Sequence, residues 1–221
     1  MSFNEFLKNH DSQLVKVCGL QSLEAAETAV SSGADLIGII CVPNRARTIQ
    51  PDIARSISEL VHDPARNPHG TKLVGVFRNQ SIIDVSIISR DYGVDIVQLH
   101  GDETWEEYHE KLGKPIIKRA VFPRDCALVE ELSHQDAYRC LPLFDSDAGG
   151  TGEKLNWGAI GDWATATPHA RFILAGGLTP DNVRDALSVP GTMGVDVSGG
   201  VETHGAKDLE KIKQFISNAK N

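Results

Sequence analysis

The sequence is poor in basic residues and has no long hydrophobic run. Its 221 residues include 22 Lys and Arg against 30 Asp and Glu, which gives a formal net charge of −8 at pH 7. A negative protein repels nucleic acid and anionic membranes, and no stretch approaches the roughly 20 apolar residues of a membrane helix. We therefore expect neither nucleic acid nor a membrane as a partner, although a local positive site can still hold an anionic substrate.

Cysteines are few and unpaired in the sequence. The four lie far apart, without a CxxC spacing, at Cys18, Cys41, Cys126 and Cys140. Zinc sites and disulfide frameworks have a different pattern. The first thirteen residues are polar and carry charges of both signs, unlike a signal peptide. These features predict a cytoplasmic protein with reduced thiols and no bound metal.

Eight short β-branched runs recur along the chain, and most are continuously apolar over four or more residues. They occupy residues 14–20, 35–42, 72–77, 95–100, 115–122, 139–145, 171–177 and 193–200. Strands buried on both faces have this composition, which indicates a parallel sheet covered by helices. Between the runs, apolar residues recur at helical spacing, although the segment after the sixth run mixes glycine with apolar residues and is the least regular.

Eight strand–helix units in a chain of this length are typical of one α/β fold, the (β/α)8 TIM barrel. A doubly wound sheet is the alternative, but no GxGxxG fingerprint follows the first strand. Because no change of composition marks a linker, we predict a single domain over residues 1–221. Residues 1–13 would form an extension ahead of the first strand, and residues 62–70 a surface loop.

In such a barrel the active site lies at the carboxyl ends of the strands, and two of those ends are rich in glycine. Gly176 and Gly177 close the seventh strand, and Ser198 and Gly199 follow the eighth. Residues 179–180, Thr-Pro, predict a helix start just beyond. Tight turns alone also use glycine, but backbone N–H groups in both loops favour a phosphate site.

The first strand ends at Cys18 and the sixth ends at Asp145. A buried cysteine is often only a small apolar residue, and an aspartate at a strand end can simply cap a helix. In a closed eight-stranded barrel, however, these two strands are three steps apart, so their ends face each other across the mouth. A thiol and a carboxyl group in that arrangement can act as base and acid.

Three other strand ends carry candidate residues. Arg47 can offer a fork of N–H groups to a carboxylate, whereas its neighbour Arg45 reads as solvated. Asp196 either steers a substrate hydroxyl or is a buried carboxylate satisfied by nearby amides. His100 titrates near neutral pH, but no carboxylate is spaced to orient it, so we predict only that it lines the pocket.

Taken together, these segments resemble a known family. They are VKVCGL, the arginine in ARTIQP, VGVF, VQLHG, LFDS followed by GGTG, AGGLTPDNV and VDVSGGVE, in this order from about Leu14 to Asn221. The chain resembles the phosphoribosylanthranilate isomerases of tryptophan biosynthesis, and the stretch ahead of the first strand resembles fungal, monofunctional forms. The resemblance implies a TIM barrel that converts N-(5-phosphoribosyl)anthranilate to 1-(2-carboxyphenylamino)-1-deoxyribulose 5-phosphate by an Amadori rearrangement, without a cofactor.

The resemblance also implies roles. The family's general base falls on Cys18, its general acid on Asp145 and its anthranilate-binding arginine on Arg47, while its phosphate loops fall on Gly176-Gly177 and Ser198-Gly199. Asp145 must then be protonated when substrate binds, which requires a pKa above about 3.9. Cys18 must be a thiolate, which requires a pKa below about 8.5. VKVCGL departs slightly from the commoner KICG opening.

Two other readings stay open. A related phosphate-binding barrel is one: a ribulose-phosphate epimerase needs a metal cluster that the strand ends do not supply, and an indole-glycerol-phosphate synthase needs a basal lysine, for which Lys16 and Lys118 are available. A barrel that only senses a phosphorylated metabolite is the other, but it needs no acid–base pair. We also expect a monomer, because no long apolar stripe is evident. Residues 146–154 are rich enough in glycine to act as a lid, but the sequence does not show whether they move.

Overall fold

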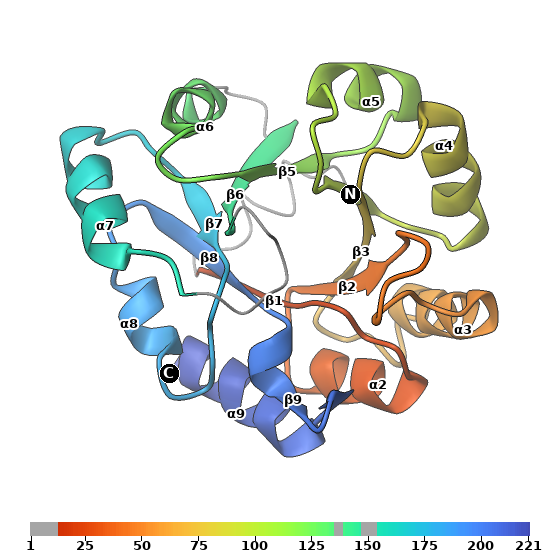
Figure 1. The fold of residues 1–221 in the computed structure, drawn as a ribbon. Coiled ribbons are helices and arrows are strands. Elements are labelled where there is room, and N and C mark those ends of the chain that lie inside the picture. Colours follow the sequence, from red (N-terminus) through yellow and green to blue (C-terminus); the bar gives the residue numbers. More distant parts are fainter. Residues whose placement is uncertain (1–12, 135–138, 147–153) are drawn as a thin grey trace.

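The computed structural model describes residues 13–134, 139–146 and 154–221, and its centre is a closed barrel of parallel strands (Figure 1). The strands are β1 (Leu14–Val17), β2 (Leu36–Ile40), β3 (Lys72–Phe77), β4 (Ile96–Leu99), β5 (Ile116–Ala120), β6 (Cys140–Phe144), β7 (Phe172–Leu174) and β8 (Thr192–Val197). Each strand pairs with the next in the chain, and β8 pairs with β1 to close the ring. The predicted TIM barrel is confirmed.

The helices of the described ranges surround this barrel, as Figure 1 shows. They are α2 (Leu23–Ser31), α3 (Pro51–His62), α4 (Ile82–Asp91), α5 (Trp105–Leu112), α6 (Cys126–Ser133), α7 (Trp157–Ala166), α8 (Val183–Leu187) and α9 (Leu209–Lys220). No helix among them combines the length and the apolar composition of a membrane span. Between β8 and α9 the chain adds a 3-10 turn (Gly199–Val201) and a small hairpin, β9 (Glu202–Thr203) and β10 (Ala206–Lys207).

The strands are apolar on both faces because each face packs against something. Outward-facing residues such as Val15 and Val17 join the cluster between barrel and helices. Inward-facing residues fill the barrel's lower interior, and they are Leu14, Leu36, Val74, Ile96, Ile117, Leu141, Leu143, Ile173 and Ala175. Side chains alternate along a strand, so Lys16 and Cys18 share the inward face of Leu14. Because of this alternation, every second side chain of each strand faces the interior as far as the carboxyl end of the barrel.

Local sequence signals were right for most helices and wrong for one. The irregular segment after β6 does form a helix, α7, capped by the Asn156 side chain, which accepts from the Ala159 N–H. The predicted start at residues 179–180 is wrong, because α8 begins only at Val183. There the Asn182 side chain accepts from the Thr179 N–H and donates to the Gly177 carbonyl, which makes a turn instead of a first helical turn.

Three smaller predictions have different outcomes. Residues 63–70 form a mostly exposed loop after α3, as predicted. The glycine-rich candidate lid lies largely outside the described residues, since 147–153 are not described. The predicted N-terminal extension also lies outside them, except for Gln13, whose side-chain amide donates to the carbonyls of Leu187 and Thr192.

Candidate active site

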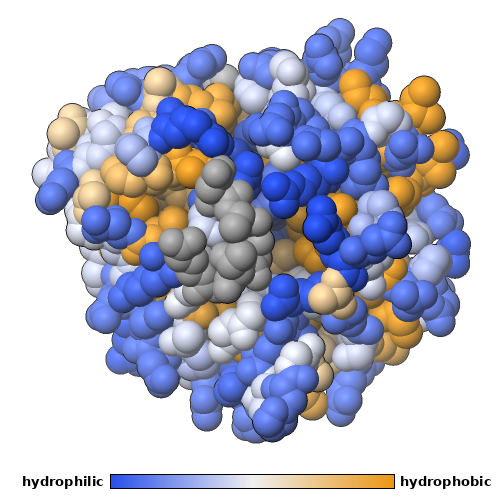
Figure 2. All heavy atoms as spheres, viewed as in Figure 1, coloured by the Kyte–Doolittle hydropathy of each residue, from blue (hydrophilic) through white to orange (hydrophobic). Residues whose placement is uncertain are grey.

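A pocket of about 680 Å³ lies at the carboxyl ends of the strands. Figure 2 shows hydrophilic side chains gathered around the centre of this face. All the predicted site residues line the pocket, and they are Cys18, Arg47, Asp145, Gly176, Gly177, Asp196, Ser198 and Gly199. The rule that barrel sites sit at carboxyl strand ends therefore predicted residues that line one pocket.

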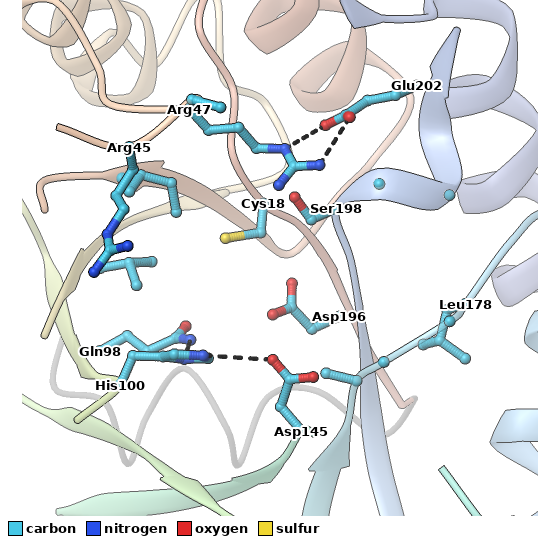
Figure 3. A pocket seen from close by; sticks show the side chains of 18 of the residues that line it. Cys18, Arg45, Arg47, Gln98, His100, Asp145, Leu178, Asp196, Ser198 and Glu202 are labelled. Carbon is cyan, nitrogen blue, oxygen red and sulfur yellow. Dashed lines mark hydrogen bonds and ion pairs between the residues drawn. The ribbon is translucent and has the colours of Figure 1, made fainter. Parts of the chain in front are cut away.

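Cys18 and Asp145 approach the pocket from opposite sides (Figure 3). The order β1-β8-β7-β6 separates their strands by three steps, as the sequence predicted. The Asp145 N–H continues the pairing of β6 by donating to the Ala120 carbonyl at 3.1 Å. Its Oδ1 accepts from the Ser146 N–H at 2.7 Å. These bonds fix the carboxyl group at the rim, where its other oxygen, Oδ2, faces the pocket.

The sulfur of Cys18 lies over a position that has no side chain. Gly38 on β2 leaves this space, because a Cβ there would come within 2.6 Å of the Cys18 Sγ. The Cys18 N–H is held by the Val197 carbonyl at 2.8 Å. Gly38 was not singled out from the sequence, since only the pairing of β1 with β2 shows what its missing side chain makes room for.

Below Cys18, a buried ion pair joins β1 to β8. The strand register places Lys16 opposite Asp196, and the Lys16 Nζ lies 2.9 Å from the Asp196 Oδ2. Burial alone would lower the pKa of Lys16, but the negative charge of Asp196 raises it above its usual value. The other oxygen, Oδ1 of Asp196, is buried and has no hydrogen-bond partner among the described residues. An acceptor in that state suits a substrate hydroxyl.

The pKa of the Cys18 thiol differs from the expectation. Burial raises it above its ordinary value, while the charges of Lys16 and Lys207 act in the opposite direction. The free protein therefore does not hold a ready thiolate at neutral pH. Cys41, also buried, is a useful contrast: burial raises its pKa to about 12, with no cation acting to lower it. What distinguishes Cys18 is its cationic surroundings.

His100 has a carboxylate partner that the sequence did not reveal. Its Nε2 lies 3.5 Å from the Asp145 Oδ2 (Figure 3), so the prediction that no carboxylate orients it is wrong. The two residues are far apart in the chain, and only the closed barrel brings them together. Burial and the positive charges of Arg119, Lys16 and Arg78 lower the pKa of His100 to about 3. The imidazole is therefore neutral at physiological pH.

Arg47 is already paired in the structure. Its Nε and Nη2 donate to the two carboxylate oxygens of Glu202, at 2.7 and 2.9 Å. The carboxylate also accepts from the Lys207 Nζ at 2.9 Å. Burial alone would raise the pKa of Glu202, but these hydrogen bonds hold it below its ordinary value. Neither Glu202 nor Lys207 was singled out from the sequence, although GGVE ends one of the recognised motifs.

The glycine loops after β7 and β8 meet backbone to backbone. A Cβ at Gly200 would collide with the Leu178 carbonyl oxygen, so only glycine allows this approach. The N–H groups of Gly176 and Gly177 make no hydrogen bond within the described part of the chain. Because α8 starts late and has five residues, these loop amides, and not a helix end, are the donors available to an anion.

The pocket also contains cations beyond Arg47. Arg45, read from the sequence as a solvated residue, is exposed but turns its guanidinium toward the pocket (Figure 3). Arg78, at the end of β3, lines the same wall. Within residues 13–134, 139–146 and 154–221, no three His, Cys, Asp or Glu side chains are grouped to hold a metal ion.

The arrangement can bind an anion and move protons. Free amides and cations attract a phosphate or a carboxylate. Across the pocket, the Cys18 thiol, beside the buried Lys16 ammonium, faces the Asp145 carboxyl group. The neutral imidazole of His100 lies beside that carboxyl group. A base on one side of a bound molecule and an acid on the other can shift a hydrogen between neighbouring atoms, which is the chemistry of an isomerase.

Known proteins resemble this chain over nearly its whole length. Residues 15–218 match the family model of N-(5'-phosphoribosyl)anthranilate (PRA) isomerase. The N-(5'-phosphoribosyl)anthranilate isomerase of Saccharomyces cerevisiae is 60% identical over 212 residues, which cover 94% of each chain. That of Zygosaccharomyces bailii is 59% identical over 204 residues, which cover 92% of this chain and 96% of the relative. The likeness to fungal forms is therefore confirmed.

Solved structures agree with the sequence comparison. Phosphoribosyl anthranilate isomerase from Thermotoga maritima has a TM-score of 0.78 at 33% identity, and the match covers 94% of this chain and 98% of that one. A second solved isomerase, with a TM-score of 0.75, 33% identity and the same coverage, is in complex with reduced 1-(o-carboxyphenylamino)-1-deoxyribulose 5-phosphate. The similarity extends over nearly the whole barrel.

Proposed function

The chain belongs to the N-(5'-phosphoribosyl)anthranilate isomerase family, and on that premise we propose that it converts N-(5'-phosphoribosyl)anthranilate to 1-(2-carboxyphenylamino)-1-deoxyribulose 5-phosphate in tryptophan biosynthesis. One observation carries the mechanistic part of the proposal. Cys18 and Asp145 face each other across a single pocket that also holds free amides and cations. Such a pocket suits a doubly anionic substrate that reacts by proton transfer.

The two anionic groups of the substrate call for two binding regions. We assign the phosphate to the loops after β7 and β8, where Gly176, Gly177, Ser198 and Gly199 offer backbone N–H groups. The anthranilate carboxylate goes to Arg47, whose guanidinium has N–H groups beyond the two that Glu202 takes. Asp196 accepts a ribose hydroxyl through its unpartnered Oδ1. The reacting carbons C1 and C2 then lie between the thiol and the carboxyl group.

The first chemical step opens the ribose ring. Asp145, protonated, donates to the ring oxygen as the C1–O bond breaks, and the anthranilate nitrogen supplies the electron pair that forms the C1=N bond. The neutral imidazole of His100, 3.5 Å from the Asp145 Oδ2, adds no positive charge that would favour the carboxylate form. The anionic substrate also favours the protonated acid.

The second step removes the hydrogen from C2. Cys18, as thiolate, takes this proton, and the C–H electrons form the C1=C2 bond while the iminium nitrogen regains its pair. The resulting enol-amine becomes the ketone when the O2 proton leaves and C1 is protonated. Burial opposes the thiolate in the free protein, so the cationic iminium, together with Lys16, must favour its formation. All steps are proton transfers, each contributing about 10²- to 10⁴-fold.

We propose a monomer in the cytoplasm. Among the described residues, the large exposed hydrophobic side chains are Ile83 and Ile87 on α4, a patch far smaller than stable interfaces require. A Thermotoga maritima relative is described as dimeric, so sedimentation or light scattering is needed to test this assignment.

The cytoplasm is favoured because the four cysteines are free thiols.

A fluorescence assay tests the proposed function. Phosphoribosylanthranilate is generated in the cuvette, and its fluorescence is followed after addition of the purified protein. We expect rapid decay with formation of the ribulose phosphate product, and growth without tryptophan when the gene is supplied to cells that lack the isomerase. A folded protein that leaves the fluorescence unchanged and fails in those cells would contradict the proposal, and ribulose 5-phosphate would then be the next substrate to try.

A further inference from the structure

The hairpin between β8 and α9 carries two charged residues that point back to the pocket. Glu202 on β9 and Lys207 on β10 are register partners, and their side chains are largely buried, with exposed fractions of 11% and 5%. A hairpin with only two residues in each strand adds almost nothing to the barrel's core. Its charged pair therefore calls for an explanation beyond packing.

Glu202 holds Arg47 by one edge only. The two carboxylate oxygens take one N–H from Nε and one from Nη2. A guanidinium has five N–H groups, so the end formed by Nη1 and the second Nη2 hydrogen stays available. In Figure 3, Glu202 approaches the guanidinium from the side away from Cys18. The available end of Arg47 is thus turned toward the centre of the pocket.

Lys207 connects this pair to the loop after β8. Its Nζ donates to Glu202 Oε1 at 2.9 Å and to the carbonyl of Ser198 at 2.8 Å. One ammonium therefore ties the carboxylate that orients Arg47 to a loop proposed to bind phosphate. The hydrogen bonds that keep Glu202 ionised, from Arg47 and Lys207, also keep the connection in place at neutral pH.

We propose that Glu202 is a positioning residue for substrate recognition: it fixes Arg47 so that the guanidinium's free end receives the anthranilate carboxylate, and Lys207 anchors Glu202 to the loop after β8. The inference rests on the proposed function, because it needs a substrate with a carboxylate at that end. An unrestrained arginine would lose rotamer freedom when the substrate binds, whereas an arginine already held by Glu202 does not. Glu202 therefore acts through Arg47 and does not touch the substrate.

Two ligands separate this role from a purely structural salt bridge. One is reduced 1-(o-carboxyphenylamino)-1-deoxyribulose 5-phosphate, and the other is the same molecule without the carboxyl group. We expect Glu202→Gln to weaken binding of the first by about tenfold and to leave the second nearly unchanged. In turnover, KM should rise by a similar factor while kcat changes little. Glu210→Gln, on the exposed face of α9, is the matched control and should behave as wild type.

A double-substitution cycle tests whether Glu202 acts through Arg47. Once Arg47→Lys has removed the fork, adding Glu202→Gln should cost little further affinity for the carboxylated ligand. If Glu202→Gln is poorly folded, Glu202→Asp, which shortens the side chain, should give the same ligand-selective loss in a smaller amount. Equal losses for both ligands, or additive losses in the cycle, would overturn the proposal. A wild type that binds neither ligand and turns over no substrate would instead contradict the proposed function.

Discussion

The interior of the barrel is divided between two regions of opposite chemistry on the same strands. Toward the amino ends, the inward-facing side chains are apolar: Leu14, Leu36, Val74, Ile96, Ile117 and Leu141. Two or four residues further along β1, β4 and β6, the inward-facing side chains are polar or reactive: Lys16, Cys18, Gln98, His100 and Asp145, and β8 adds Asp196. Every second side chain of a strand faces the barrel interior, and the closed ring brings these side chains together. The same strands therefore form both an apolar core and the candidate site.

The comparison shows how the fold separates stability from chemistry. The apolar layer contains no group that must be paired, so it contributes burial alone. The polar layer buries Lys16 and Asp196, which is costly unless they are paired, and they are. Substitutions in the lower layer should therefore affect unfolding, and substitutions in the upper layer should affect turnover.

Asp145→Asn should have the largest effect on turnover. The amide keeps the shape of the side chain but cannot supply the proton for ring opening, so kcat should fall by about 10²- to 10⁴-fold. The thermal midpoint should stay close to that of wild type, and affinity for the reduced product analogue should be kept. Near-normal turnover by this variant would remove Asp145 as the acid.

Leu36→Ala in the lower layer should show the reverse pattern. Leu36 is fully buried on β2, and truncation of a buried leucine costs about 2–5 kcal/mol of unfolding free energy. Turnover per folded molecule should stay close to wild type, because no reacting group lies in that layer. Urea unfolding measures the loss of stability, and an assay corrected for the folded fraction measures the turnover per folded molecule. A large loss of activity without a loss of stability would contradict the division of the interior.

His100→Asn should change how stability depends on pH. With a pKa of about 3 in the folded protein against an ordinary value of 6.5, His100 binds a proton below about pH 6.5 only in the unfolded chain. Wild type should then lose up to about 1.4 kcal/mol of stability for each pH unit as pH falls from about 6.5 toward about 3. The variant should lack this part of the loss. Parallel stability curves from urea unfolding at several pH values would show that the imidazole is not buried in its neutral form.

Much of the fold and of the site could be predicted because the signals are local. A continuous apolar run indicates a doubly covered strand wherever it occurs, and the residue that ends such a run is placed at the mouth of a barrel. The place of Cys18, Asp145 and Ser198 at the pocket was predicted in this way. Even the opposition of Cys18 and Asp145 required only the count of strands between them.

The contacts that were missed depend on pairings that the chain order does not reveal. Lys16 meets Asp196 through the register of β1 with β8, and His100 meets Asp145 across the barrel. Glu202 meets Arg47 through a hairpin too short to show in the sequence pattern. The late start of α8 has a different cause: a proline after a threonine resembles a helix start, but the Asn182 side chain stabilises a turn there instead.

The most direct test of the account is the turnover of Cys18→Ser beside Cys126→Ser, which removes a cysteine outside the pocket. We expect Cys18→Ser to bind the reduced product analogue as wild type does and to lose about 10²- to 10⁴-fold in kcat, because a serine hydroxyl is a far weaker base than a thiolate. Cys126→Ser should keep full turnover. Full turnover by Cys18→Ser would contradict the assignment of Cys18 as the base, and with it the proposed opposition of base and acid across the mouth of the barrel.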